Sequence, residues 1–339
     1  MVYLNYITIG MTVVKQHYKE IDVFKGLAIL LIIISHCFCS FPVDFRETSL
    51  ISVQHLIGTF NLNMFFLGSG ILFSVNGTWG DFFKKKVSRL MLPWFTFTVI
   101  ALLVKKIMAA YVKHPAGSFG HELFMDIVYG RSYWFLYALF LMMIVTKLIK
   151  NRRLLALMGG ALLISLPLIK FIPDEFSILC AKRFIYYYPW FIMGVLIKER
   201  YANISQITQA NYMKSLLCAL LILVVLILLV MTGISRQYVL QNYLMPVLGC
   251  VSFYLFSCSI SSLVKNEKIV TYFGIYSLQY YLNHLLIMLA CYYVGALIFA
   301  ISQFAALIVI FFLAVLISTI MLWVERKMPK PIRSLFGFV

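Results

Sequence analysis

Charged residues are scarce in this chain. Asp, Glu, Lys and Arg make up 12% of its 339 residues, and only 12 residues are acidic. A soluble domain has about a quarter charged residues and is roughly half apolar, whereas this chain is 63% hydrophobic with a mean hydropathy of +0.93. This composition excludes an ordinary soluble domain and predicts an integral membrane protein.

Metal-binding and nucleotide-binding motifs are also missing. The seven cysteines include no CxxC pair and lie in or beside apolar runs, which is typical of small packing residues. No GxxxxGK[ST], GxSxG or HExxH pattern occurs, and Gly68-x-Gly70 is too short for a dinucleotide fingerprint. We therefore expect no metal site and no permanently bound cofactor. No A-x-A-like cleavage site follows the first apolar run, so we expect no cleaved signal peptide.

What remains is a succession of apolar runs, each long enough to cross about 30 Å of hydrocarbon. Hydropathy predicts an all-α fold, a polytopic bundle of about ten transmembrane helices without a separate soluble domain. The predicted spans are residues 21–40, 52–75, 90–111, 132–150, 154–172, 183–198, 213–233, 238–263, 271–298 and 301–324. The predicted divisions are an N-terminal segment (1–20), a membrane domain (21–324) and a basic tail (325–339).

The formal net charge of +17 comes from Lys and Arg in short clusters between the apolar runs. Membrane topology requires such clusters, so the charge does not indicate nucleic-acid binding. The positive-inside rule places the loops with most of these residues, and both termini, in the cytoplasm. The segment 112–131 is then expected to be an external loop. Aromatic clusters such as Tyr186–Trp190 are interpreted mainly as interfacial belts.

The first span carries ionisable residues on an otherwise aliphatic helix. Lys25 and His36 are eleven residues apart, which is three helical turns plus about 20°, so they share one face about 16 Å apart along the axis. Asp22 lies on the same side within about 40°. A stripe of this kind is expected to face the bundle interior or a wet cavity, because ionisable groups are costly to expose to lipid.

Each member of this stripe has a functional and a structural interpretation. Histidine titrates near neutral pH, so His36 could remove a proton from a hydroxyl. Lys25 could hold a phosphate as a point charge. The alternative is that Lys25 extends to the lipid headgroups and His36 only satisfies a packing hydrogen bond. Because Lys25 and His36 share one helical face, we favour the functional interpretation of both residues.

The stripe resembles the opening motif of the acyltransferase-3 family, in which an Arg or Lys is followed by ten residues and a His, commonly with an Asp three positions before the basic residue. Lys25, His36, Asp22 and Gly26 match this pattern. Further similar segments follow in the family's order: Phe65–Gly70, Phe83–Pro93, Trp134–Phe140, Tyr188–Gly194 and Ser277–His284. The resemblance covers roughly residues 18–325 and is nearest to the short fucose-4-O-acetylase-like subgroup.

The resemblance implies a bacterial inner-membrane O-acyltransferase. It would move acetyl from cytoplasmic acetyl-CoA to a sugar hydroxyl of a surface polysaccharide or lipid-linked glycan. His36 would be the general base, and a covalent acyl-histidine is an open alternative. Asp22 would tune Lys25 or orient the stripe. No nucleic-acid partner is implied, and the sequence does not indicate the oligomeric state.

Other site residues follow from the same motifs. Lys25 and the basic turn would hold the phosphates of CoA, although topology and headgroup attraction alone would also account for that turn. The candidates for donor binding are Lys25, Lys85, Lys86 and Arg89. The candidates for acceptor binding or site lining are Asn61, Ser69, Trp134 and His284.

Two positions depart from the usual pattern. Asn61 stands where the subgroup has His, which bears on the acceptor. Lys25 stands where Arg is commoner, so the charge is kept but the bidentate fork is lost.

The runner-up function is a secondary transporter of a sugar or organic anion, because polar residues in spans also mark transport pathways. No second copy of the stripe appears in the later half, where a repeat-built transporter would have one. A structural scaffold is the third class.

Overall fold

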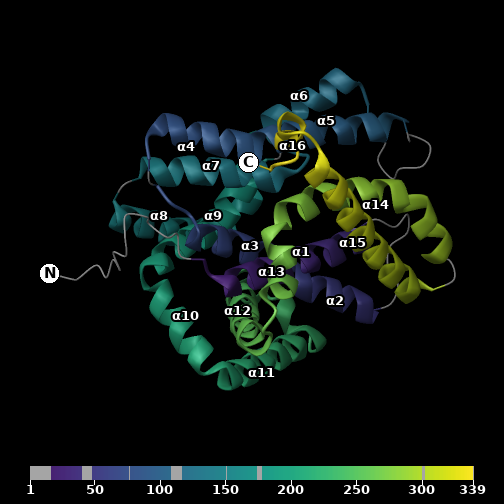
Figure 1. Ribbon diagram of the computed structural model, residues 1–339. Helices are drawn as coiled ribbons and strands as arrows, with labels where there is room; N and C mark the ends of the chain where they lie inside the picture. Colours follow the sequence, from purple (N-terminus) through teal and green to yellow (C-terminus); the bar gives the residue numbers. More distant parts are fainter. Residues whose placement is uncertain are drawn as a thin grey trace.

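The computed structural model describes residues 17–39, 48–75, 77–107, 117–149, 151–173, 178–299 and 302–338. Every regular element in these ranges is helical, so the predicted all-α class is confirmed (Figure 1). Eight stretches within the same ranges are long and apolar enough to cross a membrane. They are Lys19–Phe38, Ser49–Ile71, Trp79–Ile107, Phe119–Leu148, Arg152–Ile169, Tyr212–Met231, Leu240–Leu263 and Gln303–Lys327.

The helices follow one another with short connections. In chain order they are α1 (Lys19–Cys39), α2 (Thr48–Gly58), α3 (Asn61–Ile71), α4 (Trp79–Lys86), η1 (Val87–Met91), α5 (Leu92–Ile107), α6 (Phe119–Tyr129), α7 (Trp134–Leu148), α8 (Arg152–Ser165), η2 (Leu166–Phe171), η4 (Ile178–Cys180), α9 (Ala181–Ile197), η5 (Lys198–Arg200), α10 (Tyr201–Ala210), α11 (Tyr212–Met231), η6 (Ile234–Arg236), η7 (Leu240–Leu244), α12 (Met245–Leu263), α13 (Glu267–Ile275), α14 (Ser277–Phe299), α15 (Gln303–Lys327) and α16 (Lys330–Leu335).

The number of spans differs from the ten predicted. The predicted spans 183–198 and 271–298 are helical, but neither is among the eight. The first corresponds to α9, which has 17 residues. A helix of that length rises only about 25 Å, less than the hydrocarbon thickness. The second is divided between α13 and α14, and many side chains in the second half of α14 lie outside the described set.

The expectation of a loop at 112–131 is wrong for residues 119–129, which form helix α6. Residues 112–116 lie outside the described part of the chain, and the external side of the segment stays a prediction. Polar residues such as Glu122 and Asp126 lower the hydropathy there, but the apolar residues between them support a helix. Gly130 ends the helix in the left-handed conformation, with φ 59°. The Asp126 carboxylate accepts a hydrogen bond from the Ser132 backbone N–H at 2.7 Å. This bond links α6 to α7 across the break, and the two form one apolar stretch.

Helix α1 lies in the centre of the bundle, in contact with α3, α12, α13, α14 and α15 (Figure 1). Its contact with α13 is a backbone contact, because a Cβ at Gly274 would collide with the Asp22 carbonyl. A second close crossing joins α3 to α9 at Gly70 and Gly194. Small residues permit such close approach between membrane helices.

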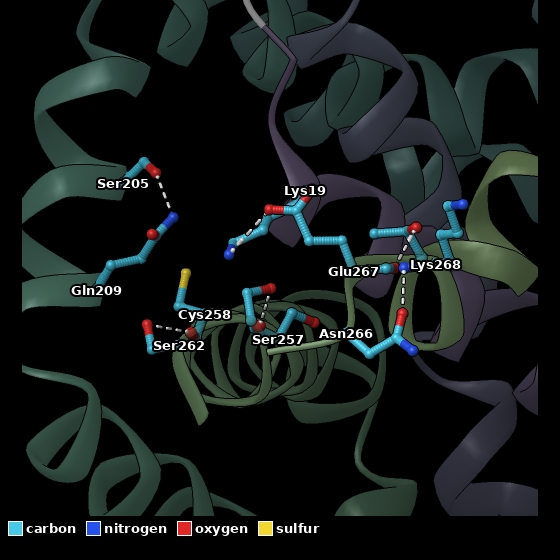
Figure 2. Close-up of polar contacts among 11 residues, drawn as sticks. Lys19, Ser205, Gln209, Ser257, Cys258, Ser262, Asn266, Glu267 and Lys268 are labelled. Carbon is cyan, nitrogen blue, oxygen red and sulfur yellow. Dashed lines mark hydrogen bonds and ion pairs between the residues drawn. The ribbon is translucent and has the colours of Figure 1, made fainter. Parts of the chain in front are cut away.

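The first turn of α1 is anchored by polar contacts. Glu20 is buried, and its carboxylate accepts hydrogen bonds from the Tyr201 hydroxyl at 2.8 Å and the Ser205 hydroxyl at 2.5 Å. Figure 2 shows the neighbouring contacts, in which the Gln209 amide donates to Ser205 and Lys19 pairs with Glu267. Helices α10 and α13 are therefore both tied to the start of α1.

Candidate active site

The two ends of the α1 stripe both lie within the bundle. The Lys25 side chain is 16% exposed. His36 is half-buried, with protein atoms of the surrounding helices close around its ring. The positions of Lys25 and His36 agree with the prediction that this face of α1 points into the bundle. Ionisable groups in a membrane helix are expected to lie there.

At one end of the stripe, Lys25 lies among groups of both signs. Its Nζ donates to the Gly274 carbonyl at 3.3 Å and lies 4.0 Å from Asp22 Oδ1. Asp22 also contacts His17, with 2.6 Å between Oδ2 and Nε2. Arg89 lies within electrostatic range of Lys25. The fold therefore places Lys25 beside Asp22, with the charge of Arg89 acting on Lys25, and Asp22 lies at this end of the stripe rather than beside His36.

The basic turn contributes only in part to this end. Lys85 is exposed, and Lys86 lies over the rings of Phe73 and Phe82, with its Nζ 5.8 and 5.6 Å from their centroids. The π-helix η1 begins directly after Lys86. Its wider turn rotates later residues relative to α4. Of the basic turn, Arg89, which is also exposed, is the residue whose charge acts on Lys25.

At the other end of the stripe, two histidines from distant parts of the chain meet. The rings of His36 and His284 have centroids 5.2 Å apart. His284 is completely buried, and its Nδ1 lies 2.9 Å from the Tyr280 carbonyl. A carbonyl can only accept, so Nδ1 carries the hydrogen and Nε2 carries a lone pair. Within the described residues, this Nε2 reaches no hydrogen-bond partner.

Aromatic side chains form a wall beside the two histidines. The Tyr281 ring lies 5.7 Å from His284. Farther along this wall, Trp134 stacks on Tyr187 at 5.5 Å, and the Arg183 guanidinium lies 4.6 Å from the Trp134 centroid. Trp134 was predicted as a lining residue, whereas Tyr187 and Arg183 were not. The tyrosine run beginning at residue 186 pointed to this wall, but its composition is equally typical of a membrane interface.

The remaining candidates lie on α3. Asn61 is buried, and its side-chain oxygen accepts from the Leu62 backbone N–H at 2.7 Å. Ser69 is half-buried beside Gly68, which packs against the Lys25 side chain. Among the described contacts, neither side chain bonds to Lys25 or His36. Asn61 and Ser69 therefore remain predictions as acceptor-site residues.

These features define a membrane-embedded enzyme, with an enclosed histidine and a cationic end on the same central helix. A family profile described as an acyltransferase domain matches residues 18–323, and the chain belongs to this acyltransferase-3 family. It is therefore a multi-pass membrane acyltransferase, which uses an acyl donor and an acceptor. The match extends over Lys25, His36, Arg89 and His284. No curated protein and no solved structure matches the chain.

Proposed function

We propose that this acyltransferase is an O-acetyltransferase. It takes acetyl from acetyl-CoA on the cytoplasmic side and transfers it to a sugar hydroxyl of a lipid-linked glycan or surface polysaccharide at a bacterial inner membrane. The observation that carries the proposal is the arrangement on α1: His36 faces His284 inside the bundle, three turns from the Lys25–Arg89 pair. Family membership supports acyl transfer as the reaction class.

In this proposal the cationic end of the stripe binds the donor. Lys25 and Arg89 hold phosphate groups of CoA, and Asp22 keeps Lys25 oriented through their 4.0 Å contact. The arm that bears the thioester then extends along α1. The separation between Lys25 and His36, about 16 Å along the helix axis, is of the scale of an extended pantetheine arm.

The histidine end carries the chemistry. His36 takes the proton of the sugar hydroxyl while the hydroxyl oxygen attacks the thioester carbonyl. The C–S bond breaks, the new C–O bond remains, and the thiolate leaves with the proton held by His36. A two-step route through acyl-His36 is also balanced. In the first step His36 takes the acetyl group and the thiol leaves, and in the second the sugar hydroxyl takes the acetyl group and His36 is released.

The test uses purified protein in nanodiscs with radiolabelled acetyl-CoA and membrane glycolipid. His36→Gln is expected to lower label transfer by about 10²–10⁴-fold, the usual contribution of a general base, while acetyl-CoA still binds. His55→Gln is the matched control. His55 lies on α2 and bonds to Ser235 at 3.2 Å, away from the stripe, so this variant should remain active.

The donor end is tested with Lys25→Gln in the same assay. The Kd for acetyl-CoA should rise about tenfold, since one charge-assisted contact is lost, and transfer at saturating donor should stay near the wild-type rate. An active His36→Gln variant would remove His36 from the chemistry. If wild type neither binds nor uses acetyl-CoA, the acetyl donor is wrong, and other acyl-CoA donors are tested next.

A further inference from the structure

Two buried polar side chains outside the stripe have no hydrogen-bond partner among the described residues. Asn283 and Glu325 are 0% and 2% exposed. Neither amide atom of Asn283 and neither carboxylate oxygen of Glu325 reaches a partner in the part of the chain that the structure describes. Buried amides and carboxyls are costly to leave unpaired, so such groups mark places where another molecule supplies the partner.

The two side chains face each other from neighbouring helices. Asn283 precedes His284 on α14, and Glu325 ends the buried face of α15. The Asn283 amide and the Glu325 carboxyl are close enough for a long hydrogen bond, but neither makes a hydrogen bond of normal length among the described residues. Both helices pack against α1. The pair therefore lies on two helices that contact α1, and Asn283 is the sequence neighbour of His284.

The chemistry of the pair selects a neutral ligand group. A buried carboxyl is less costly in its neutral form, and in that form Glu325 offers one donor and one acceptor. Arg326, the next residue, lies over the Tyr276 ring instead, with 5.2 Å between the guanidinium and the ring centroid. The Asn283 amide also donates and accepts. A ligand amide, with one N–H and one C=O, complements this pair.

We infer that Asn283 and Glu325 bind an amide group of the donor's pantetheine arm. The inference rests on the proposed function, in which that arm runs along α1 towards His36. An arm with amides that crosses an apolar bundle needs buried partners for them, and this pair is adjacent to His284. Asn283 and Glu325 thereby make the enzyme specific for a pantetheine thioester over a simple alkyl thioester.

The test compares two donors that differ in their amides, S-acetylpantetheine and S-butyl thioacetate. Asn283→Leu and Glu325→Leu should each lower kcat/KM for S-acetylpantetheine about tenfold, as expected for a lost hydrogen bond, and should leave kcat/KM for S-butyl thioacetate unchanged. Glu325→Gln should retain the preference, because Gln also donates and accepts. Ser257→Ala removes a buried hydroxyl of α12 that already bonds to the Phe253 carbonyl, and serves as the control.

The outcomes separate this inference from the proposed function. If wild type uses both donors equally well, or if the leucine variants lose activity equally with both, the pair does not bind the arm, although acyl transfer from thioesters still stands. If wild type uses no acetyl thioester, the proposed function fails first. Size-exclusion profiles identify any variant that misfolds, and Glu325→Gln then decides the question, since its loss of preference would overturn the inference.

Discussion

Helices α1 and α11 are both long enough to cross a membrane, yet they occupy opposite environments. The α1 span has a mean hydropathy of 2.0 and is 61% buried, whereas the α11 span has a mean hydropathy of 3.0 and is 17% buried. The more apolar helix is therefore the more exposed one. Lipid tails solvate apolar side chains, so the highest hydropathy marks the periphery, and the helix with ionisable residues marks the core.

The same contrast holds in the details of packing. Helix α11 buries few residues, and two serine hydroxyls of α12 donate to its backbone, Ser252 to the Ala219 carbonyl and Ser259 to the Tyr212 carbonyl, both at 2.8 Å. Helix α1 contacts α2, α3, α12, α13, α14 and α15, and it carries the site on one face. Substitutions should therefore be costly on α1 and tolerated on α11.

The largest effect on stability is expected in the α1 core. Ile29 is 0% exposed, so Ile29→Ala leaves a cavity and should lower the free energy of unfolding by about 2–5 kcal/mol. Unfolding in mixed micelles of increasing SDS content measures this change. A loss below about 0.5 kcal/mol, the range of surface substitutions, would show that α1 is not the packed centre.

A smaller loss is expected where α13 meets α1. The added methyl group of Gly274→Ala meets the Asp22 backbone, which should cost about 1–3 kcal/mol by overpacking. It should also weaken donor binding, because the Gly274 carbonyl accepts from Lys25. Gly160→Ala on α8 is the control, since its Cβ meets open space, and Ala is the better helix former by about 1 kcal/mol. Equal losses in the two variants would contradict the close contact.

The smallest effect is expected on α11. Leu228 is 56% exposed, so Leu228→Ala should change the free energy of unfolding by no more than about 0.5 kcal/mol. The same SDS titration measures it. A loss above about 2 kcal/mol, which is typical of buried leucines, would show that this face packs against protein, such as a second copy of the chain, and that its exposure does not indicate lipid.

The features that could be predicted from the sequence are those that repeat within a single helix. The helical class and the inward face of Lys25 and His36 follow from composition and the 3.6-residue period, because both depend on neighbours along one helix. The segment 119–129 was misinterpreted because it contains polar residues, although one of them, Asp126, is bonded to Ser132 across the α6–α7 break. A hydropathy average counts Asp126 as a polar residue and does not indicate that Ser132 is its hydrogen-bond partner.

The pairings within the site could not be predicted in the same way. His284 was recognised as a candidate, but its contact with His36 joins residues from the two ends of the chain and depends on how α14 packs against α1. Likewise, Arg89 acts on Lys25 electrostatically from the π-helix η1, whose position no propensity rule predicts. Asn283 and Glu325 were overlooked because an unpaired group is recognised only when its neighbours are known.

The anchoring of α1 has a consequence for biogenesis. Helix α1 is synthesised before the helices that hold it, because Glu20 is bonded by Tyr201 and Ser205, and Lys25 by Gly274, which is 249 positions later in the chain. At about 5–20 residues per second, the last of these partners emerges on the order of 10–50 s after Lys25. During that time Glu20 and Lys25 lack these contacts, so α1 reaches its native surroundings only after the helices that hold it have been made.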